Sequence, residues 1–371
     1  MTSSMSGEAT IRVDAETSYD VIVGSGLGPR LLSAVDDAVA RVAIIHPPTL
    51  RATADVLRED LAAAGKDAIT IEIPDGEKAK ASDVAAYCWS VLGQSSFTRT
   101  DLIIGLGGGA TTDLAGFVAA TWLRGVPLIQ VPTTLLAMVD AAIGGKTGIN
   151  TEEGKNLVGA FYPPELVICD LATLATMPAL DYISGMAEVV KAGFIKDPAI
   201  LDLIEADPIA AADPNADVVF ELVTRAIQVK ADVVSADFRE VVGGPTGGGI
   251  GRELLNYGHT LAHAIERVEG YRWRHGAAVS VGMVYAAEVA NLGGRLPDRV
   301  VDRHRAVLTS LGLPITYQGS RWDELLAAMK RDKKTRGDML RFIVLEDVAK
   351  AAVMEGPDPV ILVAAYDQVS A

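Results

Sequence analysis

The first half of the chain alternates short apolar runs, rich in β-branched residues, with longer segments whose apolar residues recur at helical spacing. The short runs are typical of β-strands and lie at Val21–Val23, Val42–Ile45, Ile69–Ile73, Leu102–Gly105, Leu128–Val131 and Leu166–Cys169. Segments such as Leu50–Gly65 and Ser82–Leu92 lie between them and favour helices. This alternation predicts a largely parallel, doubly wound sheet. Sheets of this kind bind nucleotides at the carboxyl ends of their strands.

The pattern changes at about Asp181. Long helical patterns then follow one another with few strand signals, at Ile183–Phe194, Ala216–Ala236, Leu254–Val268, Ala277–Leu292 and Pro297–Leu311. A short β element is indicated near Leu340–Leu345. We therefore predict an α/β protein with a Rossmann-like doubly wound domain over residues 1–180 and a mainly α-helical domain over residues 181–371.

Composition supports this prediction and limits the possible partners. A chain of 371 residues can build two domains with separate cores. Its 49% hydrophobic content and 36 glycines are typical of an α/β enzyme and argue against disorder. The net charge of −15 would repel a nucleic-acid backbone or an anionic membrane. An anionic ligand would therefore need basic residues gathered locally.

Cysteine usage and the N-terminal residues bear on the compartment. Cys88 and Cys169 provide neither a disulfide framework nor a four-thiolate zinc site. A signal peptide has a basic segment followed by an apolar one, and the first ten residues, MTSSMSGEAT, have neither. No apolar run approaches the length of about 18 residues that spans a bilayer. We expect a soluble cytoplasmic protein.

Three glycine-rich stretches could hold a phosphate. Gly24–Pro29 begins like a dinucleotide fingerprint, but Pro29 occupies the place of the last glycine, which favours a plain turn. Gly144–Thr147 ends like an ATP-binding loop, but Asp140 stands where that motif needs a glycine. Gly107–Asp113 follows an apolar strand and leads into a helix, so its backbone could approach a pyrophosphate. A tight turn without ligand is the alternative for this last stretch.

Polar residues follow the fifth predicted strand. They comprise Thr133, Thr134, Asp140, Lys146, Asn150, Lys155 and Asn156. Each lysine alone would be interpreted as a solvated surface charge. Clustered among apolar residues on loops after strands, they indicate an active-site loop that faces a bound anion.

Three of the five histidines, His259, His263 and His275, lie close together in the sequence. Leu254, Leu255, Leu261 and Ile265 give the stretch around them an apolar face at helical spacing. His259 and His263 would then lie one turn apart on one helix face, a spacing that can hold a divalent metal. A pair of core histidines satisfied by hydrogen bonds explains the spacing equally well.

With these residues, the chain resembles the 3-dehydroquinate synthases of the shikimate pathway, specifically their actinobacterial form, from about Ser18 to the C-terminus. The motifs that carry the resemblance are Pro74–Glu77 with Lys80, Gly107–Asp113, Val131–Asn150, Gly154–Phe161, Gly185–Lys191, and Asn256–Glu266 with Arg274–Gly276. The resemblance implies an NAD-binding Rossmann-like domain, a helical metal- and substrate-binding domain, and a homodimer.

The resemblance also implies a ligand set for a divalent metal, zinc or cobalt. The family's one glutamate and two histidines fall on Glu188, His259 and His275. His263 corresponds to a residue that lines the site without binding the metal, which replaces the interpretation of His259 and His263 as a ligand pair. Three protein ligands with an open position suit a catalytic zinc.

Cofactor and substrate contacts are implied in the same way. The NAD contacts fall on Asp75, Gly76, Glu77, Lys80, Gly108, Gly109, Ala110, Thr111, Thr112, Asp113, Thr133, Thr134, Lys146, Lys155, Thr173, Leu174 and Thr176. The catalytic and substrate contacts fall on Arg124 (reaching across the dimer), Asp140, Lys146, Asn156, Lys191, Lys230, Arg252, Asn256, His263 and Lys333. Lys334 is an alternative to Lys333. This gathering of basic residues suits a small phosphorylated sugar acid.

The sequence departs from the family pattern in three places. Ile45–Pro48 stands where many members have a ribose-facing acid, and Ala262 replaces a common glycine, a change that favours the helix. Gly243–Gly251 lengthens the segment between Lys230 and Arg252, and we predict a mobile surface loop there. The assignment of Arg252 depends on how this insertion is aligned.

The resemblance implies that the enzyme is a carbon–oxygen lyase that converts 3-deoxy-D-arabino-heptulosonate 7-phosphate to 3-dehydroquinate and phosphate. The steps are transient oxidation by NAD, phosphate elimination, reduction and aldol closure, with His263 and Asn256 handling the hydroxyl proton. Three alternatives remain: another sugar-phosphate cyclase of the valiolone or 2-deoxy-scyllo-inosose type, a metal-dependent polyol dehydrogenase, and a non-catalytic NAD or metal sensor. A dehydrogenase or a sensor would not need Lys146, Lys155, Lys191 and Lys230 together.

Overall fold

The computed structural model describes residues 7–241, 249–333 and 339–371. The chain divides into two compact units, Met1–Met177 and Pro178–Ala371. Most of the insertion Gly243–Gly251, with the loop predicted for it, lies outside the described residues. Within the described ranges, no helix is long and apolar enough to cross a bilayer.

In the described part of the first unit, seven strands form one sheet in the order β1-β2-β9-β6-β5-β3-β4. The strands are β1 (Ala9–Val13), β2 (Tyr19–Gly24), β3 (Arg41–His46), β4 (Asp67–Glu72), β5 (Leu102–Gly107), β6 (Leu128–Pro132) and β9 (Leu166–Asp170). Neighbouring strands are parallel, except that β1 and β2 are antiparallel. The predicted parallel sheet is confirmed, with an edge strand β1 that the sequence pattern does not indicate.

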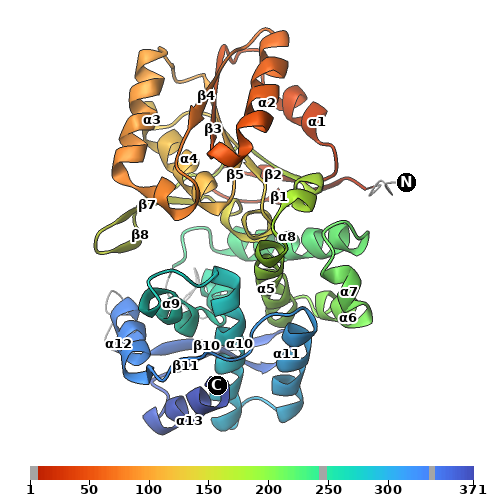
Figure 1. Ribbon diagram of the computed structural model, residues 1–371, viewed down its shortest axis with the longest axis vertical. Helices are drawn as coiled ribbons and strands as arrows, with labels where there is room; N and C mark the ends of the chain where they lie inside the picture. The colour runs from red at the N-terminus through yellow and green to blue at the C-terminus, as the bar shows by residue number, and fades with distance from the viewer. Residues whose placement is uncertain (1–6, 242–248, 334–338) are drawn as a thin grey trace. The chain divides into compact units, whose positions relative to one another are not determined.

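Helices cover both faces of this sheet (Figure 1). Ala43 and Ile45 of β3 belong to a core with α3 (Ser82–Gln94) and α4 (Gly109–Thr121). Val42 and Ile44 belong to a core with α1 (Gly28–Ala34) and α2 (Arg51–Ala63) on the other face. Because successive side chains of a strand point to opposite faces, a strand buried on both faces must be apolar throughout. Continuous apolar runs therefore marked these strands in the sequence.

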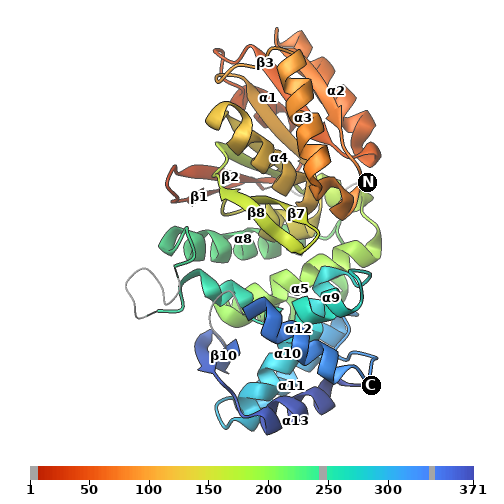
Figure 2. The same ribbon diagram turned by 90° about the vertical axis from the view of Figure 1, so that its left-hand side faces the viewer.

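The predicted active-site loop is a β-hairpin. Strands β7 (Lys146–Thr151) and β8 (Gly154–Phe161) pair antiparallel, and β7 packs against α4 (Figure 2). Polar residues and glycines interrupt the apolar positions of both strands, so periodicity gives little sign of them. The polar residues that the sequence assigned to a loop are thus carried on a regular element.

The second unit is mainly helical in its described part. Its helices are α5 (Ala179–Ile195), α6 (Ala199–Ala206), α7 (Pro208–Ala211), α8 (Val218–Ala236), α9 (His259–Val268), α10 (His275–Leu292), α11 (Asp298–Ser310), α12 (Trp322–Lys333) and α13 (Pro359–Val369). α10 is buried along most of its length and packs against α5, α9, α11 and α13. β10 (Arg341–Asp347) and β11 (Lys350–Glu355) form the predicted β element as an antiparallel hairpin.

The helix predicted over Leu254–Val268 is shorter in the structure. Gly251–Asn256 forms a 3-10 turn, and α9 begins only at His259. Gly258 between them has φ of 79°, in the left-handed region that glycine adopts without strain. A Cβ there would also lie 2.9 Å from the backbone nitrogen of Met283. Apolar spacing continues across this break, so periodicity alone merges the two elements.

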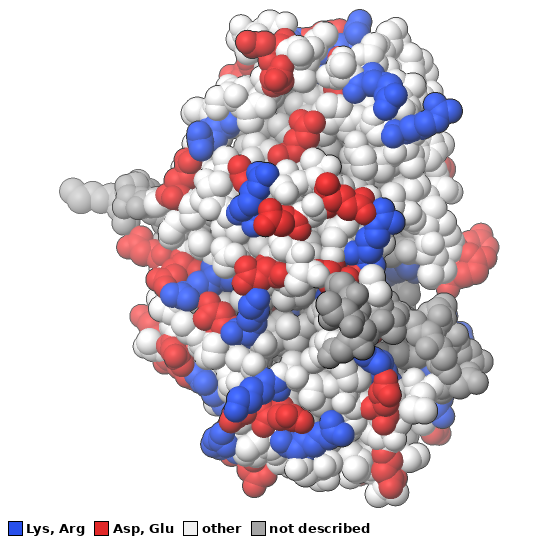
Figure 3. Space-filling model, turned by 180° about the vertical axis from the view of Figure 1, so that it is seen from behind, with Lys and Arg blue, Asp and Glu red and all other residues white. Residues whose placement is uncertain are grey.

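The charged side chains are spread over the surface. On the face shown in Figure 3, Lys and Arg are interspersed with Asp and Glu. Many of them form ion pairs, such as Arg51 with Glu72 at 2.6 Å and Arg303 with Glu205 at 2.8 Å. Such exposed pairs contribute little to stability. Several of the basic residues assigned to an anion site are instead buried, namely Lys191, Lys230 and Arg252.

Candidate metal centre and cofactor-binding turns

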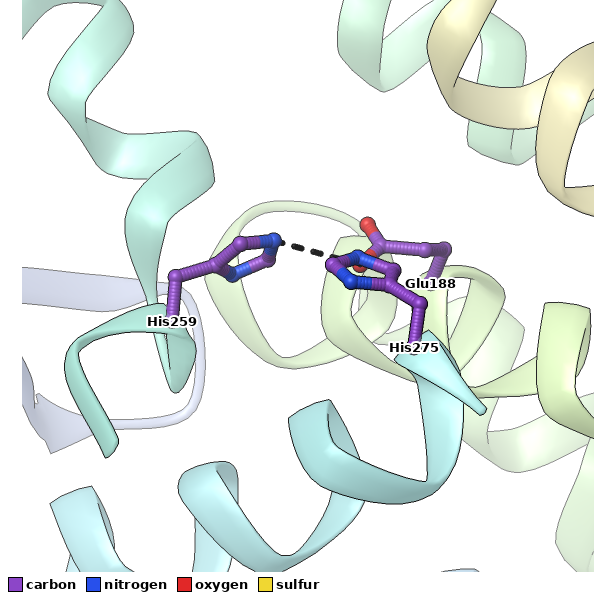
Figure 4. Close-up of side chains that lie close together, drawn as sticks. All are labelled: Glu188, His259 and His275. Carbon is purple, nitrogen blue, oxygen red and sulfur yellow. Dashed lines mark ion pairs between the residues drawn. The ribbon is translucent and has the colours of Figure 1, made fainter. Parts of the chain in front are cut away.

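Three side chains from three helices of the second unit converge on one point (Figure 4). Glu188 lies on α5, His259 is the first residue of α9, and His275 is the first residue of α10. One ligand atom from each lies within 4.8 Å of the others. The Nε2 atoms of His259 and His275 lie 3.5 and 3.6 Å from Glu188 Oε1. Two imidazole nitrogens and one carboxylate oxygen fit a divalent zinc or cobalt ion and leave coordination positions for other ligands.

In both histidines the outer ring nitrogen, Nδ1, which is not the one nearest Glu188, has a hydrogen-bond partner. Nδ1 of His259 lies 3.1 Å from the carbonyl oxygen of Tyr257, and Nδ1 of His275 lies 3.3 Å from Glu266 Oε2. Both partners are acceptors, so Nδ1 of each ring is the donor and Nε2 is the nitrogen that faces Glu188. The two rings are thus held with Nε2, the nitrogen that would bind a metal, directed at Glu188.

Close packing of α10 on α5 brings His275 to Glu188. A Cβ on Gly276 would lie 1.7 Å from the backbone oxygen of Ser184, so no larger residue fits between the helices. The backbone nitrogen of Gly276 donates to Ser184 Oγ at 3.1 Å. Ser184 lies one turn before Glu188, which explains how a glycine next to one ligand positions it against the other.

The charges of the centre are coupled. Glu188 is buried and forms an ion pair with Lys191, whose Nζ also donates to the Leu255 carbonyl at 2.7 Å. Burial, reinforced by the Lys191 cation, lowers the pKa of His259 to about 3. Burial also lowers the pKa of His275, but the carboxylates of Glu188 and Glu266 outweigh it and raise the pKa to about 10. A bound cation would therefore displace a proton from His275 but find His259 already neutral.

Other predicted substrate residues lie near this centre. The His263 ring is 5.3 Å from that of His259 and 6.4 Å from that of His275, and the side chain is exposed. The Asn256 amide donates to Glu240 Oε1 at 3.3 Å. Arg252 is buried, and its Nη1 donates to the Phe238 carbonyl at 2.7 Å. Lys230 is buried on α8, which packs against α5 and the 3-10 turn Gly251–Asn256.

In the first unit, the predicted pyrophosphate turn joins β5 to α4. β5 ends at Gly107, Gly108 precedes α4, and α4 begins at Gly109. A Cβ on Gly107 would lie 2.6 Å from Thr111 Oγ1, so the turn is too tight for a side chain. Thr133, directly after β6, donates its backbone N–H to the Gly107 carbonyl at 2.9 Å. The free N–H groups at the start of α4 therefore point from a rigid corner of the sheet, as an anion site requires.

A polar network lies beside the first turn of α4. Lys80 is buried, and its Nζ lies 2.5 Å from Asp113 Oδ2 and also contacts the Asn156 side chain. Glu77 accepts a hydrogen bond from Asn150 at 2.7 Å and pairs with Lys155 at 3.8 Å. Burial raises the pKa of Asp113, and the nearby Lys80 cation opposes that shift. The structure thus brings together predicted NAD contacts from three separate elements, the 3-10 turn Gly76–Lys80, α4 and β8.

Comparisons of the sequence with family models and with curated proteins point to the same family over most of the chain. Family models for the N-terminal and C-terminal parts of 3-dehydroquinate synthase match residues 70–184 and 185–335. A curated 3-dehydroquinate synthase of Streptomyces avermitilis is 61% identical over 351 residues, covering 95% of this chain and 94% of that protein. The chain belongs to the 3-dehydroquinate synthase family.

Solved structures of two other synthases are similar in fold but more distant in sequence. A 2-deoxy-scyllo-inosose synthase complexed with carbaglucose-6-phosphate, NAD+ and Co2+ superposes with a TM-score of 0.86 at 26% identity, covering 97% of this chain and all of that one (100%). The 2-epi-5-epi-valiolone synthase of Streptomyces hygroscopicus, with NAD+ and Zn2+ bound, gives 0.85 at 26% identity, covering 97% and 99%. The predicted family and fold class are confirmed.

For this 3-dehydroquinate synthase family member, the remaining predicted contacts have varied surroundings. Lys146 is exposed at the start of β7, and Arg124 is exposed in a left-handed conformation with φ of 69°. Asp140 lies in a single π-helical turn, Ala137–Ala141. The side chain of Leu174 is buried, so only its backbone could face a ligand. Lys333 ends α12, and its side chain, like Lys334, lies outside the described part.

Sequence reasoning gave no role to three residues that the structure makes prominent. His46 is buried at the end of β3, and its Nδ1 lies 2.9 Å from the Pro47 carbonyl. Glu240 contacts Asn256 from a left-handed backbone with φ of 54°. Glu266 contacts His275. Only Glu266 left a usable signal, because it lies two turns after His259 on the same face of α9.

Proposed function

We propose that this chain converts 3-deoxy-D-arabino-heptulosonate 7-phosphate to 3-dehydroquinate and phosphate. The convergence of Glu188, His259 and His275, inside a family match that spans both units, carries the proposal. Oxidation of the C5 hydroxyl to a ketone, with its hydride transferred to the nicotinamide, would acidify the C6 hydrogen, and loss of that proton would expel phosphate from C7. The hydride then returns to C5, the ring opens, and aldol addition forms the carbocycle, so the reaction is redox-neutral overall.

Glu188, His259 and His275 would hold the divalent cation, zinc or cobalt. When bound there, the cation supplies Lewis acidity toward substrate oxygens. The chain's own residues would do the rest near this centre. Lys191, through its ion pair with Glu188, connects the metal ligands to the anion-binding residues. His263, exposed beside the rings of His259 and His275, and Asn256 would hold and move a hydroxyl proton.

NAD would lie against the turns at the carboxyl ends of β4, β5 and β6. Bound there, NAD would supply reversible hydride transfer without turning over in the net reaction. The turn Gly107–Asp113 and the N-terminus of α4 would receive the pyrophosphate. Asp75–Lys80, Thr133, Thr134, Lys155 and the turn Thr173–Thr176 would complete the site. The network of Lys80, Asp113 and Glu77 supports this assignment, because it fixes the polar groups beside the turn.

Basic side chains would bind the phosphate and carboxylate of the substrate. Lys146 of the first unit and Lys191, Lys230 and Arg252 of the second would supply the positive charge. Arg124, Asp140, Asn156 and Lys333 would be further substrate contacts. Burial of Lys191, Lys230 and Arg252 strengthens their interaction with an anion, since screening by water is weaker there. A polyol dehydrogenase has no use for such a group. The chain is 61% identical to a 3-dehydroquinate synthase but 26% identical to the solved 2-deoxy-scyllo-inosose and 2-epi-5-epi-valiolone synthases. This difference favours dehydroquinate formation over the alternative cyclisations.

We also propose a cytoplasmic homodimer. Cys88 and Cys169 are free and buried, as is common in a reducing compartment. Leu123 has φ of 49° and is 40% exposed, next to Arg124, and β8 leaves Leu157 61% exposed. Strained and apolar residues at the surface are features that a second subunit would cover. The negative net charge gives no reason to expect nucleic acid or an anionic membrane as a partner.

The test is to measure phosphate release from the heptulosonate substrate with catalytic NAD and added zinc or cobalt. One phosphate should appear per substrate consumed, with no lasting rise in NADH absorbance. Steady NADH accumulation in proportion to substrate consumed would contradict the proposal and favour a dehydrogenase. Phosphate release with a carbocycle other than 3-dehydroquinate would instead favour another cyclase.

A further inference from the structure

The two histidines of the metal centre differ in what holds their outer nitrogen. His259 is held by the carbonyl of Tyr257, a neutral acceptor two residues before it. His275 is held by the carboxylate of Glu266, at 3.3 Å from Nδ1 to Oε2. A carboxylate behind a metal-binding histidine fixes the ring and increases the basicity of the nitrogen that faces the metal. The two nitrogen ligands are therefore not equivalent.

Glu266 is well placed for such a role. Its side chain is 10% exposed and lies on α9, two turns after His259, whereas His275 begins the next helix. The backbone oxygen of Glu266 accepts a hydrogen bond from Tyr271 at 2.6 Å, which fixes the end of α9. The contact between Glu266 and His275 thus connects the helix that supplies one ligand to the helix that supplies the next.

We propose that Glu266 is a positioning residue for the metal ligand His275. Its carboxylate accepts the Nδ1–H of His275, so Nε2 is the only ring nitrogen left to bind the metal and is aimed at Glu188. It also brings a second carboxylate to the centre, which favours a doubly charged cation over the vacant site. The proposal rests on the metal centre of the proposed function and adds a residue that would act through His275.

The test measures metal affinity directly, without an activity assay. The full-length protein is stripped of metal, and Zn2+ and Co2+ are titrated in competition with a chromophoric chelator at constant pH. The variants are Glu266→Gln, which keeps the size but not the charge, and Glu266→Ala, which removes the contact. We expect affinity to fall about 10-fold in E266Q and toward about 100-fold in E266A, the range for loss of an outer partner of a ligand. The visible spectrum of the Co2+ form should change as well.

The matched control is Glu269→Gln, which alters another glutamate at the end of the same helix. Glu269 accepts hydrogen bonds from Tyr317 at 2.7 Å and Arg321 at 3.3 Å. E269Q should bind Zn2+ and Co2+ like the parent, whatever it does to stability. Thermal unfolding of each metal-free variant shows whether it is folded, and E266Q decides the question alone if E266A does not fold.

The outcomes separate this proposal from the proposed function. Metal affinity within about twofold of the parent in a folded Glu266 variant overturns the positioning role and leaves the metal centre standing. A loss of affinity in E269Q equal to that in E266Q has the same meaning. Glu188→Ala with unchanged affinity overturns the metal centre itself. Weakened binding in the Glu266 variants, with E269Q unaffected, supports the positioning role.

Discussion

The carboxylate of Asp237 accepts a hydrogen bond from the backbone N–H of Arg252 at 3.0 Å, across the glycine-rich insertion. Its other oxygen accepts the N–H of Val241 at 2.9 Å, so one buried side chain holds both flanks of the insertion. The guanidinium of Arg252 is in turn held by the carbonyl of Phe238. The position of Arg252 is therefore fixed from the end of α8 and does not depend on the intervening segment.

Shortening the insertion should be tolerated. We expect removal of residues 243–248, joined by a short turn, to change the free energy of unfolding by less than about 1 kcal/mol, since loop length has a small entropic cost. Activity should stay within about threefold if the segment is not a second phosphate site. Urea unfolding and the phosphate-release assay check both parts. A large loss of activity at unchanged stability would show that the insertion works in the site.

Asp237→Ala tests the flanks themselves. It leaves the N–H groups of Val241 and Arg252 without their charged acceptor, so the free energy of unfolding should fall by about 3 kcal/mol. Substrate KM should rise because Arg252 loses its backbone anchor. Asp232→Ala on the exposed side of α8 is the matched control, since Asp232 pairs with Lys196 at 2.8 Å and is 41% exposed. Equal effects of the two changes would argue against a specific role for Asp237.

Sequence patterns located the central strands well. They located poorly those elements whose apolar pattern glycines or polar residues interrupt, or whose ends a glycine sets. Strands such as β3 and β5 are buried on both faces, so their apolar runs are continuous and easy to recognise. β7 carries Lys146, Thr147 and Asn150, and its packing against α4 could not be foreseen from spacing. The left-handed backbone of Gly258 separates the 3-10 turn Gly251–Asn256 from α9 without interrupting the apolar pattern.

The candidate metal centre shows what spacing cannot reveal. His259 and His263 have the spacing of a ligand pair, yet the group that converges takes its second nitrogen from His275, on another helix. That approach depends on Gly276, which lets α10 contact α5. No local pattern records a contact between helices so far apart in the sequence, and only resemblance to a family indicated it. Glu266 lay inside a recognised motif but gained a role only from its distance to His275.

Replacing the histidines one at a time should separate metal binding from proton handling. His275→Ala should lose both bound zinc and activity, because it removes one of three ligands. His263→Ala should keep the metal and still lose activity by about 100-fold or more, as expected for an acid–base residue. Metal analysis by mass spectrometry after gel filtration checks the first part. A content of one zinc per chain in H275A would show that the ligand set is wrong.

In the proposed homodimer, Arg124 should act across the subunit interface. R124A and H275A homodimers should each be inactive. Mixed under conditions that exchange subunits, they should form heterodimers in which one site has an intact metal centre and receives Arg124 from the other chain. Half of the molecules would then carry one active site, so activity should recover to about a quarter of the parent value. If Arg124 acts within its own chain, the mixture stays inactive.

Stability should depend on pH through His304, a histidine outside the metal centre. The ring is buried and stacks on Phe194 at 3.5 Å between centroids, and its Nε2 lies 2.8 Å from Tyr257 Oη. Burial lowers the pKa of His304 to about 4, with a smaller contribution from Arg303. Below the ordinary pKa near 6.5, the unfolded chain takes up a proton that the folded chain refuses, so stability falls as the pH drops. The loss should begin near pH 6.5 and approach about 3 kcal/mol at pH 4, from about 1.4 kcal/mol per pKa unit.

His304→Gln keeps a polar side chain at this position but cannot titrate. Its free energy of unfolding at pH 7 should be lower than that of the parent, because the stacking on Phe194 is lost. Between pH 6.5 and pH 4, however, its stability should fall less steeply than that of the parent, since every other titrating group is shared. Urea unfolding of metal-free protein at a series of pH values gives the two slopes. Parallel slopes would mean that His304 takes up its proton equally well in the folded chain, and that its burial does not hold it neutral.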